Sequence, residues 1–351
     1  MTARPTLLTS GLSRRFDRAL ALEKVGFSLG EGERLAVLGP SGSGKTTLLR
    51  LLAGLDAPQE GTIEIAGKLA SSPGKVELAP ESRGVALVFQ GLALFPHMSA
   101  RAQVAFFARG SRREARADEL LGRIGLGERA LARPDELSGG ERQRLAVARA
   151  LAQEPRILLL DEPFSNLDRE LRALLRKDLR ALLDSLRTTV ILVTHAREDA
   201  LALASRVLVL ESGRAVAEGA IEELVARPGS AAVVRALGLG AVVRGEVSGP
   251  GEVSTAFGIA RARLEGQRGQ VSLLVRPEQA RVLGEDELGG AAGEVVSVEL
   301  VAPEARSLRH EAIVRVGDAI LHARAGAPVP PPGARVRVAL EGELEPIEGG
   351  G

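Results

Sequence analysis

Short apolar runs, each followed by a stretch with helical spacing, repeat along the first two thirds of the chain. The runs are almost continuously apolar, which is typical of strands buried on both faces of a parallel sheet. They are RLAVLG from Arg34, VALVF at 85–89, ILLL at 157–160, VILVT at 190–194 and RVLVL at 206–210. A glycine- and serine-rich turn leads from the first run into TTLLRLLAGL, a helical stretch that we expect to end at Gly54. The alternation predicts an α/β fold with a parallel sheet.

Two further regions show other patterns. Residues 91–150 are rich in charged residues and alanine, and they predict a helical subdomain at about 91–155, inserted beside the sheet. After about residue 235 the chain consists of short alternating runs between glycines and prolines, which predict a small all-β barrel. We therefore expect two domains, 1–235 and 236–351.

Length agrees with two domains, and composition excludes several kinds of site and partner. A chain of 351 residues exceeds the size at which one hydrophobic core usually stops growing. The charges nearly cancel, 46 basic against 45 acidic, so no overall field attracts nucleic acid or an anionic membrane. Cysteine is absent, which excludes disulfides and thiolate metal sites and fits a reducing cytosol. There is no secretion-signal core at the N-terminus and no run of about 18 apolar residues, so we expect no membrane crossing.

A glycine-rich motif follows the first apolar run. The sequence Gly39-Pro-Ser-Gly-Ser-Gly-Lys45-Thr46 fits G-x-x-x-x-G-K-[ST] between a strand and a helix. We expect its backbone N–H groups to bind phosphate, Lys45 to reach the β and γ phosphates, and Thr46 to bind Mg²⁺. The candidate ATP-binding residues are Gly39, Pro40, Ser41, Gly42, Ser43, Gly44, Lys45, Thr46 and Thr47. The alternative is a glycine-rich connection that only turns the chain.

Two carboxylates end the strand predicted at 157–160. The carboxyl end of such a strand faces the ligand crevice, so Asp161 can orient Mg²⁺ while Glu162 polarises the attacking water. In isolation the same pattern fits a strand whose acidic end meets solvent. The phosphate loop upstream favours the functional interpretation.

A second candidate anion site begins at Ser138. Ser138-Gly139-Gly140 at a predicted helix start can bind an anion, and an ordinary N-cap with a flexible glycine pair is the alternative. The stretch LSGGERQ closely resembles the signature motif of the ATP-binding cassette (ABC) family. The resemblance implies an ATPase that works as a head-to-tail homodimer. In such a dimer, the signature motif of each copy closes over the nucleotide held by the other copy's phosphate loop.

Further positions match motifs of the family in the family's order. By this resemblance, Gln90 senses Mg²⁺ and the attacking water, and Leu92–Ser99 faces the membrane partner. Asp168, at the end of SNLD, belongs to a loop that crosses the dimer interface, and His195 contacts the γ-phosphate. A histidine at a strand end is by itself more often a plain polar terminus. Its place in the ordered set is what favours a functional role.

Phe16 is the candidate adenine platform. The family places an aromatic residue before its first strands, and an aromatic ring can stack on the base. Aromatic residues make up only 2% of the chain, so each one outside an apolar run stands out. The alternatives are that Phe27 takes this part or that Phe16 has a simple core role.

The β-rich tail narrows the resemblance to importers. A cassette with a C-terminal TOBE-type, OB-like domain resembles the ATPases of molybdate, sulfate, polyamine, maltose and ferric-iron systems. The stretches FQGLALFPHMS, LLLDEPFSNLDRELR and LLVRPEQ are most similar to the ferric-iron group, so ferric iron is the expected cargo. The signature motif has one departure from the family pattern, because Glu141 stands where many members have glutamine.

The resemblance also implies partners and a place in the cell. It implies two permease subunits or domains in the membrane, and indirect work with a solute-binding protein. The expected location is peripheral, on the cytoplasmic face of the inner membrane.

Two alternatives concern other functions of the chain. A non-transport ABC ATPase acting on nucleic acid or ribosomes would carry a coiled-coil insertion or two cassettes. A barrel that binds nucleic acid would show stacking aromatics, whereas only Phe257 is aromatic beyond residue 235, so we expect no nucleic-acid partner. The tail could also bind an oxyanion or a sugar as a regulatory ligand, or only pack the dimer.

Overall fold

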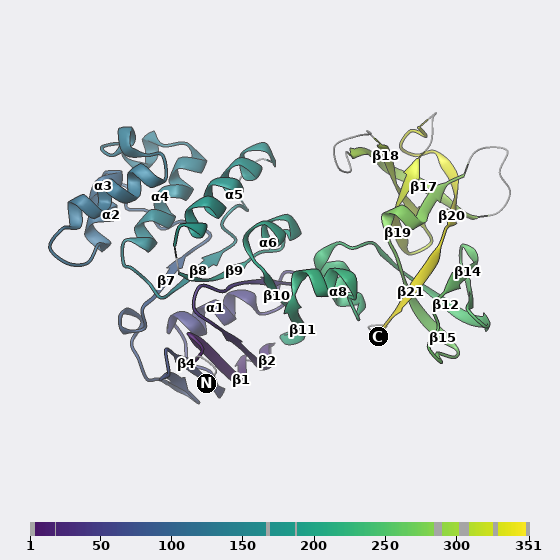
Figure 1. Ribbon diagram of the computed structural model, residues 1–351, viewed down its shortest axis with the longest axis horizontal. Coiled ribbons are helices and arrows are strands. Elements are labelled where there is room, and N and C mark those ends of the chain that lie inside the picture. The colour runs from purple at the N-terminus through teal and green to yellow at the C-terminus, as the bar shows by residue number, and fades with distance from the viewer. Residues whose placement is uncertain are drawn as a thin grey trace. The chain divides into compact units, whose positions relative to one another are not determined.

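The computed structural model divides into two compact units, Met1–Ile221 and Glu222–Gly351 (Figure 1). The described residues are 4–17, 19–165, 169–186, 188–283, 290–301, 309–325 and 329–348. The change of pattern near residue 235 falls in the second unit, within helix α8 (Ala231–Leu237).

A six-stranded sheet forms the centre of the first unit. Its strands are β3 (Arg34–Leu38), β7 (Val85–Val88), β8 (Ile157–Asp161), β9 (Thr189–Val193), β10 (Arg206–Glu211) and β11 (Arg214–Ala220). Their order is β11-β10-β3-β9-β8-β7, with parallel neighbours from β10 to β7 and an antiparallel β11 at one edge. All five apolar runs form strands, which confirms the predicted α/β fold.

Helices cover the two faces of this sheet. They are α1 (Lys45–Ala53), α2 (Ala100–Phe107), α3 (Arg113–Arg123), α4 (Gly139–Leu151), α5 (Arg169–Asp184) and α6 (Arg197–Leu203). Successive residues of β8 point to opposite faces. Leu158 and Leu160 pack in the core shared with α2 to α5, whereas Ile157 and Leu159 pack in the core shared with α1. The predicted helical insertion is confirmed as α2 to α4, grouped beyond β7 in Figure 1.

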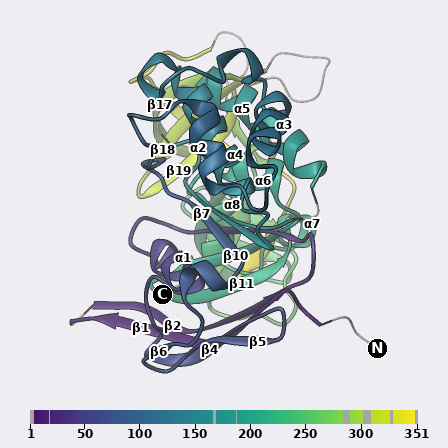
Figure 2. The same ribbon diagram turned by 90° about the vertical axis from the view of Figure 1, so that its left-hand side faces the viewer.

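An antiparallel sheet that we did not predict packs on α1. Its strands are β1 (Leu7–Phe16), β2 (Ala19–Leu29), β4 (Glu60–Ile65), β5 (Lys68–Ser72) and β6 (Lys75–Val76), in the order β2-β1-β4-β5-β6. Figure 2 shows this sheet below α1. Leu7, Leu12 and Ile63 share the core with Leu48 and Leu52 of α1. The buried positions of β1 recur at intervals of two or three, and this weak alternation was the available signal.

The second unit begins at the second residue of α7 (Ile221–Ala226) and contains α8 and two closed barrels, where the sequence predicted one. The first barrel holds β12 (Ala241–Gly249), β13 (Glu252–Thr255), β14 (Gly258–Ala262), β15 (Gln270–Val275) and β21 (Glu343–Ile347). The second holds β16 (Ala280–Val282), β17 (Ala291–Val301), β18 (Arg309–Val316), β19 (Ala319–Ala325) and β20 (Arg335–Leu340). Strand β21 closes the first barrel from the far end of the chain, pairing with both β14 and β15.

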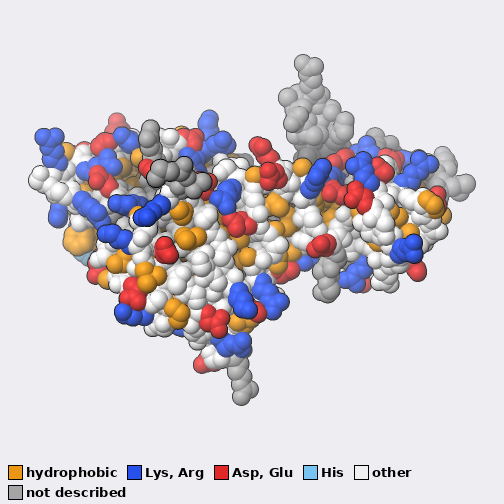
Figure 3. Space-filling model, turned by 60° about the horizontal axis from the view of Figure 1, so that its bottom comes forward, with side chains coloured by type: hydrophobic (Ala, Val, Ile, Leu, Met, Phe, Trp, Pro, Cys, Tyr) orange, Lys and Arg blue, Asp and Glu red, His pale blue; other side chains and the backbone are white. Residues whose placement is uncertain are grey.

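The surface carries mixed charge. Figure 3 shows acidic and basic side chains interspersed on the face it presents, in keeping with a net charge of +1. Within the described ranges, every helix is too short or too polar to cross a bilayer.

Candidate active site

The phosphate loop connects β3 to α1 and requires glycine at two positions. Gly39 has φ 156 and Gly44 has φ 102, in a region that favours glycine. A Cβ atom on Gly39 would lie 2.1 Å from the carbonyl oxygen of Leu210, and one on Gly44 would lie 2.2 Å from that of Ala21. Neither position therefore has room for a side chain.

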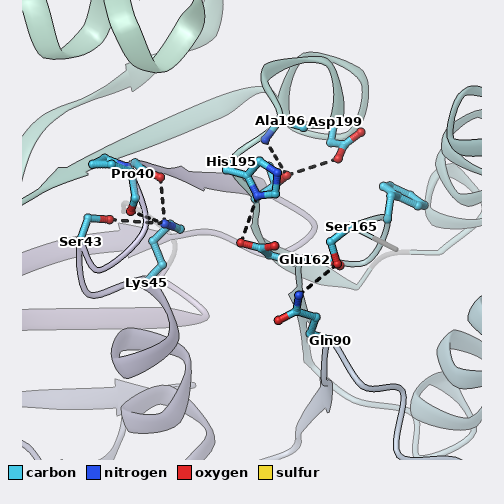
Figure 4. Close-up of polar contacts among 12 residues, drawn as sticks. Pro40, Ser43, Lys45, Gln90, Glu162, Ser165, His195, Ala196 and Asp199 are labelled. Carbon is cyan, nitrogen blue, oxygen red and sulfur yellow. Dashed lines mark hydrogen bonds and ion pairs between the residues drawn. The ribbon is translucent and has the colours of Figure 1, made fainter. Parts of the chain in front are cut away.

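Lys45 lies against this loop. Its Nζ donates to the carbonyl oxygens of Gly39 at 2.8 Å and Pro40 at 2.7 Å, and it lies 3.5 Å from Ser43 Oγ (Figure 4). The residue is only 6% exposed. Burial lowers the pKa of the Lys45 ammonium, while the charge of Glu162 and then that of Asp161 act in the opposite direction. Hydrogen bonds thus hold the lysine against the loop, and the charges of Glu162 and Asp161 act on its ammonium group.

The rest of the loop presents polar groups at its surface. Ser41, Gly42 and Thr46 are exposed, whereas Ser43 is buried. Thr46 and Thr47 stand in the first turn of α1, which has no acidic residue there. This helix start combines exposed backbone donors with a partial positive charge, so it suits an anion.

The acidic pair ends β8 in an unusual backbone conformation. Glu162 has φ 45, a left-handed conformation that is strained for a side chain of this kind. Its N–H still donates to the carbonyl oxygen of Val193 at 2.9 Å, so the ladder to β9 continues through it. Burial raises the pKa of the Asp161 carboxyl, as does the charge of Glu162, and Lys45 opposes both. The chain therefore turns at Glu162, immediately after the half-buried Asp161 that ends β8.

Three neighbouring parallel strands bring the candidate catalytic residues to one edge of the sheet, where strands β7, β8 and β9 end. His195 Nδ1 lies 3.2 Å from Glu162 Oε1. Gln90 Nε2 donates to Ser165 Oγ at 3.3 Å, and that hydroxyl donates to the carbonyl oxygen of Glu162 at 3.1 Å. Figure 4 shows Gln90, Glu162 and His195 side by side, with Lys45 across from them. The edge therefore gathers an acid, a histidine and an amide next to the phosphate loop.

Ser138–Gly140 begin helix α4 and have contacts of their own. Ser138 is the N-cap, with its Oγ accepting from Glu141 N at 3.3 Å. Glu141 Oε2 in turn accepts from Ser138 N at 2.8 Å, which completes a capping box. A Cβ on Gly140 would lie 3.0 Å from Leu175 Cδ1 of α5. Glu141, the departure from the family pattern, is therefore accommodated by the cap of this helix.

The two early phenylalanines have different environments. Phe27 is 5% exposed and packs in the core with α1. Phe16 is 42% exposed at the end of β1, and Arg14 Cζ lies 4.8 Å from its ring centroid. This exposure suits stacking on a base better than it suits a core role. Asp168 lies outside the described residues.

Sequence reasoning missed two residues next to His195. Thr194 and Asp199 are 2% exposed each, and Thr194 Oγ1 donates to Asp199 Oδ2 at 3.3 Å. No motif pointed to either residue. A polar residue directly after an apolar strand was the only signal for Thr194.

The chain is similar to known proteins along most of its length. The ABC transporter family model matches residues 22–165. The Fe(3+) ions import ATP-binding protein FbpC 3 of Rhodococcus jostii (strain RHA1) is 40% identical over 300 residues, covering 85% of each chain. The sulfate/thiosulfate import ATP-binding protein CysA of Nocardia farcinica (strain IFM 10152) is 42% identical over 245 residues, covering 68% of this chain and 72% of that protein.

A solved structure is similar as well. The dimeric structure of an ATP-binding cassette in a post-hydrolysis state, bound to ADP and phosphate, is 31% identical with a TM-score of 0.53. The similarity covers 61% of this chain and 98% of that one.

Proposed function

The chain belongs to the ABC transporter family, and we propose that it is the ATP-hydrolysing subunit of an importer that takes up ferric iron through a separate permease. Membership of the family confirms the resemblance drawn from the motifs. The similar proteins are ATP-binding subunits of Fe(3+) and sulfate import, so the chain is an importer ATPase with iron as the leading cargo. The observation that carries the proposed chemistry is the contact between Glu162 and His195 within the field of Lys45.

In the proposed reaction, the loop holds ATP and the strand ends act on water. The backbone of Gly39–Thr47 and the ammonium of Lys45 bind the phosphates, because converging N–H groups and a full positive charge stabilise a polyanion. Glu162 polarises the attacking water. His195, 3.2 Å from that carboxylate, orients it and contacts the γ-phosphate. Phe16 stacks on adenine with its exposed ring.

The residues at this edge also fit a magnesium ion. Thr46, Gln90 and Asp161 offer hydroxyl, amide and carboxylate oxygens, the hard ligands that Mg²⁺ prefers. Among the described residues there is no group of three or more His, Cys, Asp or Glu that could hold a metal by itself. Mg²⁺ needs only a few protein ligands when phosphate oxygens and water complete its coordination shell. Bound there, the ion would neutralise charge that develops on the phosphates.

Two copies of the chain complete the proposed site. One of the similar solved structures is a dimer of an ABC cassette, which supports a homodimer here. We place Ser138–Gly140 and Asp168 of one copy against the nucleotide of the other. The dimer would bind two permease subunits or domains at the cytoplasmic face of the inner membrane, and would work indirectly with a solute-binding protein.

The division of labour along the chain is also part of the proposal. Residues 1–235 would bind and hydrolyse ATP, with the helical subdomain at about 91–155 carrying the signature motif. Residues 236–351 would form a regulatory, TOBE-type domain, which requires no nucleic-acid partner.

Uptake in cells tests the function. Cells lacking the chain would be complemented with the wild type or with Glu162→Gln, and uptake of radiolabelled ferric iron and of sulfate would be measured. The proposal expects the wild type alone to restore iron uptake. Restored sulfate uptake without iron uptake would assign the sulfate alternative, and equal restoration by both chains would contradict an ATP-driven role for Glu162.

A further inference from the structure

Two arginines on one face of helix α5 contact the segments that follow β8 and β9. Arg172 Nε donates to the carbonyl oxygen of Phe164 at 3.1 Å, and its Nη2 donates to that of Ser165 at 3.5 Å. Arg176 Nε lies 3.1 Å from Asp199 Oδ1. Residues four positions apart share a helix face, so one face of α5 reaches both segments.

Asp199 carries the contact from α5 onward to the backbone around His195. Thr194 Oγ1 donates to Asp199 Oδ2 at 3.3 Å and accepts from Ala196 N at 3.0 Å (Figure 4). Thr194 and Ala196 are the two neighbours of His195 in the chain. The hydroxyl of Thr194 therefore closes a small turn around the histidine, and Asp199 holds that hydroxyl in place.

The pair of Arg176 and Asp199 is costly to bury. The side chain of Asp199 is 3% exposed and that of Arg176 is 19% exposed. Burial raises the pKa of the Asp199 carboxyl, and the guanidinium of Arg176 acts in the opposite direction. Such buried ion pairs add little net stability compared with apolar residues, although removing one partner alone is destabilising. Arg176 Nε and Asp199 Oδ1 are within ion-pair distance but make no hydrogen bond, so Arg176 acts on Asp199 through its charge.

We propose that Thr194, Asp199 and Arg176 are positioning residues that hold His195 against Glu162. The inference rests on the proposed roles of His195 and Glu162. Arg172 of the same helix hydrogen-bonds to Phe164 and Ser165, two and three residues after Glu162. The segments that carry both partners of the 3.2 Å contact are thus connected to α5, which keeps them in a fixed position relative to each other.

The hydroxyl of Thr194 gives the cleanest test. Thr194→Val keeps the shape of the side chain but removes its donor and acceptor. We expect kcat for ATP hydrolysis by the full chain to fall about tenfold to a hundredfold, because small displacements of a catalytic group have effects of that order. KM for ATP should stay within about twofold, since binding depends on the phosphate loop. Thr194→Ser, which restores the hydroxyl, should recover most of kcat.

A second variant and a matched control complete the set. Asp199→Asn should lower kcat in the same way, with thermal melting to show that the chain is folded. Arg180→Gln is the control, because Arg180 lies one turn beyond Arg176 on α5, is 59% exposed and pairs with Asp184 at 3.9 Å. It should leave kcat and KM near those of the wild type.

His195→Ala separates this inference from the proposed function. If the threonine acts through the histidine, Thr194→Val should change the residual single-turnover rate little when His195→Ala is already present. Additive losses would indicate a general structural role and overturn the inference. An impaired His195→Ala with a fully active Thr194→Val would overturn it as well. If His195→Ala hydrolysed ATP at the wild-type rate, the proposed role of His195 would itself fail.

Discussion

The two units of the molecule differ in how much backbone strain and how many buried polar side chains they contain. Among the described residues, all but one of the buried polar or charged side chains lie in the first unit, and the exception is Ser272. The described non-glycine residues with positive φ all lie in the first unit too, Glu162 among them. The second unit has an apolar core formed by the inner faces of its strands. Strain and buried charge are costly, so their concentration in the first unit fits the proposal that this unit carries the chemistry.

The largest difference should come from adding one methyl group to a glycine in each unit. Gly44→Ala places Cβ 2.2 Å from a backbone oxygen at φ 102, whereas Gly251→Ala at φ 70 meets nothing nearer than 3.7 Å. We expect Gly44→Ala to lower the free energy of unfolding by about 3 kcal/mol and Gly251→Ala by about 1 kcal/mol, because only the first adds a clash to the strain. Denaturant titration of both variants gives these values. Equal losses would remove the contrast between the units.

Removing a positively charged side chain in each unit should have a smaller effect, and only the change in the first unit should alter ATP affinity. Lys45→Ala should weaken ATP binding by about 2 kcal/mol, or roughly thirtyfold, because a charged donor to the phosphates is lost. Arg244→Ala, at an exposed position of β12 in the second unit, should leave ATP affinity unchanged. Calorimetric titration with ATP measures both. An unaltered affinity of Lys45→Ala would argue against the phosphate loop.

The smallest effect concerns a surface ion pair of the second unit. Hydrogen bonds from Arg281 first, and the charge of Arg324, lower the pKa of Glu341 below its ordinary value of 4.5. For a carboxyl with a lowered pKa, the stabilisation is complete above the ordinary value and is lost as the pH falls through the folded value. Because the group is largely exposed, Glu341→Gln should cost at most about 0.5 kcal/mol at neutral pH. Unfolding measured against pH should show this difference vanish in acid, and a larger or pH-independent loss would contradict the ion-pair explanation.

Sequence patterns predicted the part of the fold where each element has a strong local signal. The continuous apolar runs placed β3, β7, β8, β9 and β10, and the motifs placed the candidate site at their ends. The antiparallel sheet was missed because β1 is irregularly paired, with shifts of register at Thr9, Leu12 and Arg14 that blur its alternation. The division into two barrels was missed because β21 pairs with β14 and β15, although the five strands of the other barrel lie between them in the sequence. Local sequence patterns do not indicate pairing between such distant strands.

The candidate site was predictable residue by residue but not as a network. Motif spacing indicated Glu162 and His195, yet nothing in the sequence indicated that their side chains lie 3.2 Å apart. The contacts of Thr194, Asp199 and Arg176 depend on how α5 and α6 pack beside the sheet. The conformation of Glu162, at φ 45, could not be read from the residue type either, because glutamate rarely adopts it.

In the proposed reaction Glu162 polarises the attacking water, and single-turnover ATP hydrolysis by Glu162→Gln is the sharpest test of that role. Glu154→Gln is the matched control, because Glu154 is an exposed glutamate with a similar backbone, at φ 50, away from the strand end. We predict that Glu162→Gln binds ATP as the wild type does and accumulates as an ATP-bound dimer. Its hydrolysis should fall by about a hundredfold or more, with Glu154→Gln unaffected. Hydrolysis by Glu162→Gln at the wild-type rate would show that Glu162 does not activate the water.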